Sequence, residues 1–235
     1  MCTAIAYKGK DLIYGFNLDI DPKVWKYDVY RTRNYFSVGI TVGSTTYLTH
    51  GVTRDGVFAN IPYMNGPRES YPVGTKKHRI DLVVNKILRG KMNLSEVKEI
   101  LCADGQAIAS PKNLSFHSLF GDASGGFFLV EPGIGWRDIQ ERYAVITNFP
   151  ALRAGDYSNG YYGLDRYEKA KTGLEAASHH FTPWNALDLL HSVSQEGEWA
   201  TRVTFAYSQN ENTVYYYLNN DRDHVQVHRF SGNGR

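Results

Sequence analysis

The residue of this sequence best suited to chemistry is Cys2, which directly follows Met1. Removal of Met1 would leave Cys2 with both a thiol and a free α-amino group. These groups titrate at about 8.5 and about 8, so proton transfer between them near neutral pH costs little. One residue would then supply both the nucleophile and the base. N-terminal threonine hydrolases use the same arrangement, in which the terminal amine activates the threonine hydroxyl. Many proteins carry a small second residue without a catalytic reason, so Cys2 alone does not establish a function.

The residues after Cys2 predict a β-hairpin. Residues 2–7 and 12–17 are two strand-like runs separated by a polar turn. Such a hairpin would return Asn17 and Asp19 to the side of Cys2. A carboxylate at position 19 would hold the new ammonium group in place, and a strand-end turn with an Asx hydrogen bond is the alternative interpretation.

Length and composition favour one domain over residues 1–235. The chain is 42% hydrophobic, which is enough to bury one substantial core. A net charge of +2 does not favour nucleic acid or a membrane surface as partner. No apolar run approaches the roughly 20 residues that span a bilayer, and the N-terminus lacks a signal pattern. We therefore expect a cytoplasmic protein.

The remaining cysteine and the histidines do not indicate a metal site. Cys102 falls in an apolar helical pattern, where we expect a buried small side chain and no disulfide framework. Of the eight histidines, His179 and His180 are adjacent and none show metal-ligand spacing. We expect neither a metal nor a cofactor.

Strands and helices alternate in blocks along the chain. Strand-like runs cover residues 28–33, 38–42, 46–49, 57–63, 114–120, 126–130, 143–147, 202–207, 213–218 and 225–229. Helical patterns cover 80–88, 94–101 and 164–177, and a further helix opens at Thr182 and Pro183. Strands, two helices, strands, two helices and strands again predict an α+β sandwich of two stacked sheets with helices outside.

Several short motifs together resemble one known family. They are Met1-Cys2-Thr3, Gly15-Phe16-Asn17-Leu18-Asp19, Asp55-Gly56-Val57, the Gly121-Asp122 hairpin that ends in Glu131, and Val145-Ile146-Thr147-Asn148-Phe149-Pro150. Their order is similar to that in the choloylglycine hydrolases, N-terminal nucleophile (Ntn) hydrolases that include bile salt hydrolases and penicillin V acylases. The resemblance implies a four-layer αββα sandwich of two antiparallel sheets. This chain is shorter than the usual members, and the difference falls between Asn148 and Arg166.

The resemblance implies a role for five positions. Cys2 would be the nucleophile and its amine the base, with Asp19 holding both. Tyr63 and Asn148 stand where the family forms its oxyanion hole, and Arg166 stands where it has an active-site arginine. From the residues alone, Tyr63 remains open as a core aromatic, Asn148 as a turn former, and Arg166 as a charge on a helix surface.

One position departs from the family pattern. Members usually have arginine after the glycine that is Gly15 here, and this chain has Phe16. A cation there would favour the thiolate of Cys2, so its loss removes a charge that lowers the pKa of the thiol. Either Arg166 or Arg202 compensates, or the protein is a slow enzyme, or it is no longer an enzyme.

The resemblance implies an acylase that cleaves a linear amide with an apolar acyl group, such as phenoxyacetyl or fatty acyl. We expect Phe16, Asn17 and Asn60 to contact this small-molecule substrate. An aromatic cluster near the expected site comprises Tyr157, Tyr161, Tyr162 and Tyr167. Two alternatives stay open: a bile salt hydrolase, or a catalytically silent relative that binds a small molecule or acts in assembly. A homo-oligomer is compatible with either.

Overall fold

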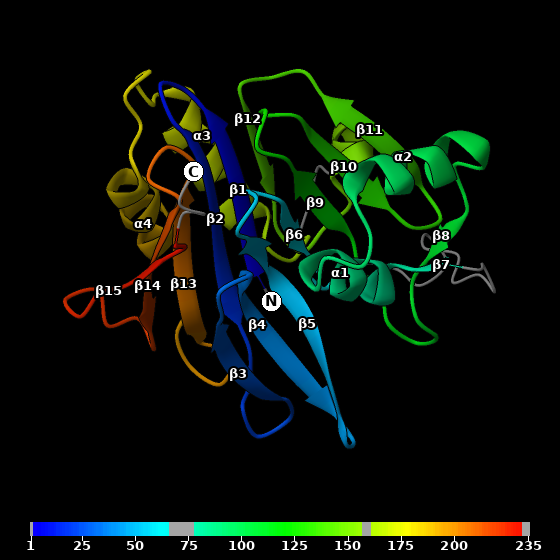
Figure 1. Ribbon diagram of the computed structural model, residues 1–235, viewed down its shortest axis with the longest axis horizontal. Helices are drawn as coiled ribbons and strands as arrows, with labels where there is room; N and C mark the ends of the chain where they lie inside the picture. Colours follow the sequence, from blue (N-terminus) through cyan, green and yellow to red (C-terminus); the bar gives the residue numbers. More distant parts are fainter. Residues whose placement is uncertain (1, 66–77, 157–160, 232–235) are drawn as a thin grey trace.

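Two large β-sheets stack face to face with a pair of helices on each outer face (Figure 1). The computed structural model describes residues 2–65, 78–156 and 161–231. Helices α1 (Ile80–Leu88) and α2 (Leu94–Ala103) cover one sheet. Helices α3 (Leu164–Glu175) and α4 (Pro183–Ser192) cover the other. The α+β prediction of two antiparallel sheets inside four layers is therefore confirmed.

The first sheet is antiparallel throughout and contains the start of the described chain. Its order is β12 (Tyr143–Ile146), β1 (Cys2–Lys8), β2 (Leu12–Asp19), β13 (Thr201–Ser208), β14 (Thr213–Leu218) and β15 (Gln226–Arg229). Strands β1 and β2 form the predicted hairpin, with Cys2 opposite Leu18. Strand β1 therefore has a neighbour on each side, β2 and β12.

The second sheet packs on the first through its inner face. Its order is β11 (Gly135–Ile139), β10 (Phe127–Glu131), β9 (Ser118–Gly121), β6 (Phe58–Asn60), β5 (Thr45–Thr53), β4 (Tyr35–Val42) and β3 (Lys26–Arg31). A short parallel pair, β7 (His78–Arg79) and β8 (Ile108–Ala109), lies beside α1, and the 3₁₀ segment η2 (Ala151–Asp156) follows β12.

Apolar side chains fill each of the three spaces between layers. Between the sheets, Phe16 and Phe205 of the first sheet meet Phe36 and Phe58 of the second. The other two clusters lie under α1 and α2 and under α3 and α4. Strand β12 and its neighbour β1 are therefore buried on both faces, as the run 143–147 predicts for β12.

Local signals define two of the helix starts. Asn93 and Glu96 form a reciprocal capping box at the start of α2. Thr182 and Asn185 form another at α4, with Pro183 in the first turn. These caps satisfy backbone N–H groups that have no partner inside the helix.

Three sequence predictions are wrong in detail. Strand β5 continues through Thr53, four residues beyond the end of the predicted run 46–49. The predicted strand 57–63 is limited to β6, because Pro62 lacks the N–H that would extend it. Cys102 is exposed rather than buried, since it lies on the outer side of α2.

No helix within the described residues is long and apolar enough to cross a membrane.

Candidate active site

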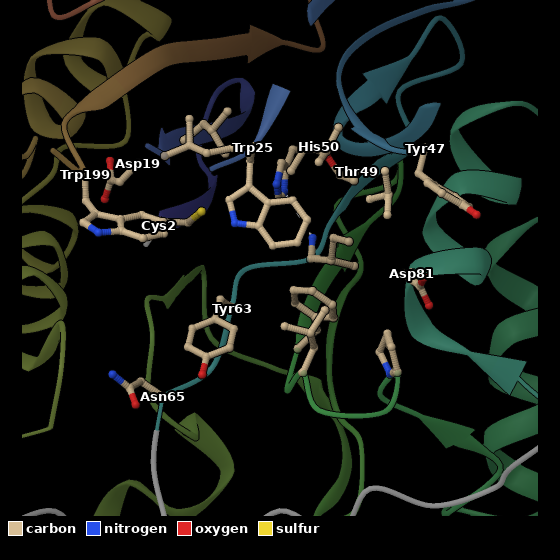
Figure 2. A pocket seen from close by; sticks show the side chains of 18 of the residues that line it. Cys2, Asp19, Trp25, Tyr47, Thr49, His50, Tyr63, Asn65, Asp81 and Trp199 are labelled. Atoms are coloured by element: carbon tan, nitrogen blue, oxygen red, sulfur yellow. Dashed lines mark hydrogen bonds between the residues drawn. The ribbon is translucent and has the colours of Figure 1, made fainter. Parts of the chain in front are cut away.

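A largely apolar cavity of about 610 Å³ opens where the end of β2 meets β4 and β5 (Figure 2). Its apolar wall is formed by Leu18, Ile20, Trp25, Ile40, Val42, Ile61, Leu114, Phe116 and Trp199. Cys2, Asp19 and Tyr63 also line it. The volume is that of a small-molecule pocket.

Cys2 is fixed by the two strands that flank β1. On one side, Cys2 pairs with Leu18 of β2. On the other side, Ala4 pairs with Ile146 of β12, and the same antiparallel register places Asn148 beside Cys2. The backbone N–H of Cys2 donates to Oδ1 of Asn148 at 3.0 Å. The thiol is thereby held at the edge of the cavity.

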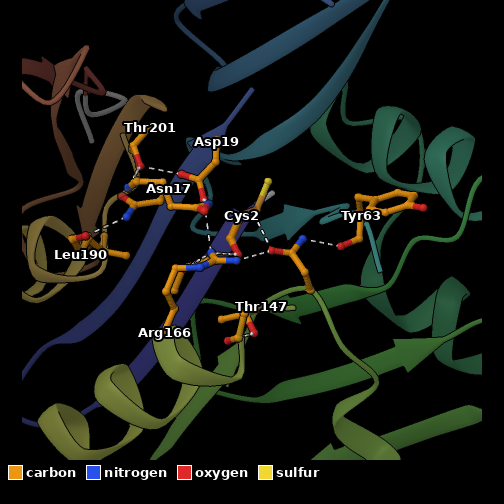
Figure 3. A network of polar contacts seen from close by, with 12 residues as sticks. Cys2, Asn17, Asp19, Tyr63, Thr147, Arg166, Leu190 and Thr201 are labelled. Carbon is orange, nitrogen blue, oxygen red and sulfur yellow. Dashed lines mark hydrogen bonds and ion pairs between the residues drawn. The ribbon is translucent and has the colours of Figure 1, made fainter. Parts of the chain in front are cut away.

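Arg166 lies behind Cys2 and joins the polar groups around it (Figure 3). Its Nη1 donates to the carbonyl oxygen of Cys2 at 2.9 Å, and to Thr3 Oγ1 at 3.0 Å. The same atom lies 3.2 Å from Asp19 Oδ2, and Nη2 donates to Asn148 Oδ1 at 2.6 Å. Arg166 is 6% exposed, so it is not a charge on a helix surface.

Asp19 is buried and accepts hydrogen bonds from three side chains. Besides Arg166, Thr201 Oγ1 donates to its Oδ1 at 2.6 Å and Gln195 Nε2 donates to its Oδ2 at 2.7 Å. Burial raises the pKa of Asp19, and Arg166 and the two neutral donors oppose that rise. The carboxylate is therefore held in place from several directions.

Tyr63 and Asn148 are in contact through the Tyr63 backbone. Nδ2 of Asn148 donates to the carbonyl oxygen of Tyr63. Tyr63 forms an isolated bridge with Phe116, and its flanking bonds run from His117 N to Pro62 O and from Met64 N to Ser115 O. The N–H of Tyr63 therefore points away from residue 116 and finds no acceptor among the described residues. This N–H lies on the same side of the strand as the Tyr63 carbonyl oxygen that Asn148 contacts.

The thiol of Cys2 is poorly ionised in this environment. Burial and, to a smaller extent, the charge of Asp19 raise its pKa to about 11, while the terminal ammonium group, the Asp19 backbone hydrogen bond and Arg166 act in the opposite direction. Of the two arginines expected to replace the missing cation, Arg166 lies at the site. Arg202 does not line the cavity.

Three residues expected to contact substrate do not line the cavity. Phe16 is in the core between the sheets. Asn17 points to the opposite face of β2, where it donates to Leu190 O at 2.7 Å and accepts from Thr204 Oγ1 at 2.8 Å. Asn60 exchanges hydrogen bonds with the Leu119 backbone. All three side chains support the fold.

The tyrosines expected to form an aromatic cluster lie in different surroundings. Tyr162 lines the cavity, and Tyr167 packs edge-on against Phe149. Tyr157 lies outside the described residues. Trp25 and His50 also line the cavity, and no motif in the sequence marks either of them.

A buried His117–Glu131 pair supports the strand end that carries Asn148. Nδ1 of His117 lies 3.1 Å from Glu131, and Nε2 lies 2.8 Å from the carbonyl oxygen of Thr147. Glu131 also accepts from the backbone N–H groups of Ala151 and Leu152. The position of Asn148 is therefore fixed on both sides. Across the described residues, no group of histidine, cysteine, aspartate and glutamate side chains could hold a metal ion.

Comparison of the sequence with models of known protein families finds no match, and comparison with curated proteins finds none either. The fold, in contrast, is similar to that of solved structures. A mutant conjugated bile acid hydrolase from Clostridium perfringens superimposes with a TM-score of 0.66 at 15% identity, covering 97% of this chain and 92% of that one. Penicillin V acylase from Agrobacterium tumefaciens gives 0.59 at 17%, covering 96% and 84%.

A third similar structure is the Caenorhabditis elegans ortholog of N-acylethanolamine-hydrolyzing acid amidase, with a TM-score of 0.57 at 13% identity over 88% of this chain and 93% of that one. Identities this low establish the fold and not the activity. The chain has the αββα sandwich of the Ntn hydrolases, and the resemblance to choloylglycine hydrolases holds at the level of the fold.

Proposed function

We propose that this protein is an amidohydrolase of the choloylglycine hydrolase type, with Cys2 as its N-terminal nucleophile once Met1 is removed. The observation that carries the proposal is the position of Cys2, whose side chain lines an apolar cavity while its backbone is held by Asn148 and Arg166. The substrate is a small linear amide whose acyl group is apolar, in keeping with the cavity wall.

The catalytic steps follow from these positions. The Cys2 thiolate attacks the amide carbonyl, and its new terminal amine takes the thiol proton and passes it to the leaving amine. The Tyr63 N–H and the Asn148 amide donate to the oxyanion, and one such donor contributes about 3 kcal/mol in other acyl-transfer enzymes. Water then releases the acyl group from the thioester.

Trimming also changes the electrostatics of Cys2. The amine would replace an amide nitrogen that now donates to Asn148 Oδ1 at 3.0 Å. Arg166, the partner of Asp19, also contacts the carbonyl oxygen of Cys2. The terminal ammonium already lowers the pKa of the thiol, and trimming moves this charge onto Cys2 itself, where it favours the thiolate more strongly.

A second candidate is a catalytically silent relative that binds a small molecule in the same cavity. The observation that favours it is Phe16, which stands where the resemblance implies a cation. A silent relative would keep the cavity and lack turnover.

Intact mass and turnover separate these candidates. The enzyme hypothesis expects a mass that lacks Met1, and hydrolysis of at least one member of a panel of penicillin V, N-acyl homoserine lactones and conjugated bile salts. Cys2→Ala should abolish that hydrolysis, while Cys102→Ala should not change it, because Cys102 is exposed on α2. Retention of Met1, or unchanged turnover by Cys2→Ala, would contradict the proposal. A trimmed protein that binds panel members without turnover favours the silent relative.

A further inference from the structure

His50 is a buried histidine at the cavity that the proposed mechanism does not use. It lies on β5 and is 2% exposed, yet it lines the same cavity as Cys2 (Figure 2). Its ring stacks on Phe16, with centroids 4.3 Å apart and an interplanar angle of 19°. Phe16 of the first sheet therefore holds one face of the His50 ring.

The hydrogen bonding of the ring determines its tautomer. The backbone N–H of Ile61 donates to Nδ1 of His50 at 3.2 Å, so Nδ1 carries a lone pair. Burial lowers the pKa of His50 to about 3, and the ring is neutral at ordinary pH. A neutral imidazole whose Nδ1 accepts must carry its hydrogen on Nε2.

This Nε2–H group has no acceptor among the described residues. Some described side-chain atoms lack a partner and are also fully sealed from solvent, and Nε2 of His50 is not one of them. Nε2 therefore keeps some exposure, and since His50 lines the cavity, this exposure is to the cavity. The neighbouring wall is apolar, with Trp25, Ile40 and Ile61, and the Thr49 hydroxyl already donates to Val38 O at 3.1 Å. A buried donor without a partner costs about 1–3 kcal/mol, which a ligand acceptor would recover.

The β1–β2 hairpin connects the position of His50 to that of Cys2 through Phe16. Cys2 and Phe16 are diagonal neighbours on one face of the β1–β2 hairpin, since Cys2 pairs with Leu18 and Ala4 pairs with Phe16. Diagonal neighbours of this kind are about 7–8 Å apart. Because His50 stacks directly on Phe16, a ligand beside Cys2 in this cavity would also be within the reach of its ring.

We propose that His50 is a specificity residue whose Nε2–H donates to an oxygen in the acyl part of the substrate. The preferred acyl group then carries an ether, hydroxyl or keto oxygen, with an apolar remainder along the wall. The identity of the bound molecule as a substrate rests on the proposed function. The donor site itself does not.

Binding to a form that cannot turn over tests this inference. In Cys2→Ala, calorimetry compares phenoxyacetamide with 3-phenylpropanamide, which replaces the ether oxygen by a methylene group. We expect the ether to bind about 10-fold more tightly, the value of one neutral hydrogen bond to a buried donor. Adding His50→Leu should reduce this ratio to about 1, while His50→Gln, which keeps an N–H donor, should retain part of it.

Tyr47→Phe in the same background is the matched control, because it removes another polar group of the cavity wall. It should leave the ratio unchanged. Equal affinity for the two amides, no binding of either, or a ratio that disappears with Tyr47→Phe and survives His50→Leu would overturn the inference. Hydrolysis of the panel by the unsubstituted protein tests the proposed function separately, so the two can fail independently.

Discussion

At the scale of single residues, Arg166 holds the site together. One guanidinium contacts the backbone of Cys2, the carboxylate of Asp19 and the amide oxygen of Asn148. A buried ion pair stabilises little in total, because desolvation offsets the attraction. Removal of one partner is different, since it leaves the other charge buried and uncompensated.

We therefore expect Arg166→Ala to lower the free energy of unfolding by about 3–5 kcal/mol, measured by urea denaturation. Lys171→Ala is the control, because Lys171 pairs with Glu175 on the same helix but at the surface. That exposed pair should contribute only about 0.3–0.5 kcal/mol. Equal losses for the two variants would show that the Arg166–Asp19 contact is not maintained in solution.

His50 gives a pH dependence of stability whose sign can be stated. Its pKa falls from 6.5 in the unfolded chain to about 3 in the folded protein. Below pH 6.5 the unfolded chain therefore binds a proton that the folded protein does not. The free energy of unfolding should decrease as pH falls from 6.5 toward 3, by up to about 1.4 kcal/mol per pH unit.

The measurement is urea denaturation between pH 4.5 and 7.5 for the parent protein and His50→Leu. As the pH falls, His50→Leu should lose less free energy of unfolding than the parent protein. His224→Gln serves as control, because Asp221 raises the pKa of the exposed His224 and so acts with the opposite sign. An acid slope that His50→Leu does not change would contradict the burial of a neutral ring.

At the scale of elements, the start of α3 brings Arg166 to the site. Gly163 caps this helix with φ of +87°, a left-handed conformation that favours glycine. A Cβ atom there would lie 2.7 Å from Nη2 of Arg166 and 3.1 Å from Thr147 Oγ1. The absence of a side chain at this position lets the guanidinium reach Asn148.

Gly163→Ala should therefore strain the backbone and also displace the guanidinium of Arg166 from the site. Gly90→Ala is the matched control, since Gly90 has φ of +66° but nothing within 4 Å of the added Cβ. Both variants should lose about 1–2 kcal/mol of stability. Only Gly163→Ala should also reduce kcat/KM on the best panel substrate, by on the order of 100-fold. An equal reduction in Gly90→Ala would point to a general loss of fold.

At the scale of the whole molecule, the stacking of the two sheets makes the cavity. Phe205 contacts Phe16 on its own sheet and Phe36 and Phe58 on the other. Because Phe16 is also the surface on which His50 stacks, the packing of the sheets continues into the cavity wall.

Phe205→Ala should lower the free energy of unfolding by about 3–5 kcal/mol, because it leaves a cavity between the sheets. The control is Val227→Ala, at a side chain that is 54% exposed on β15, where we expect a change within about 0.5 kcal/mol. Urea denaturation measures both. A loss below 1 kcal/mol for Phe205→Ala would mean that the sheets are not packed as described.

The sequence by itself determined the elements whose signals are local. The hairpin of β1 and β2, the capped helices α2 and α4 and the block order of strands and helices all follow from neighbouring residues. Cys2 and Asp19 could be placed together for the same reason, because one short hairpin carries both.

Only the tertiary structure decided which face of each strand meets the cavity. Side chains alternate along a strand, so Phe16 and Asn17 could not both reach one pocket, but the alternation does not say which face is which. Both faces of β2 are buried, one against the second sheet and one against α4, and no polarity pattern separates them. The placement of Arg166 behind Cys2 and of His50 over Phe16 joins segments more than 30 residues apart, and such contacts depend on how whole layers pack.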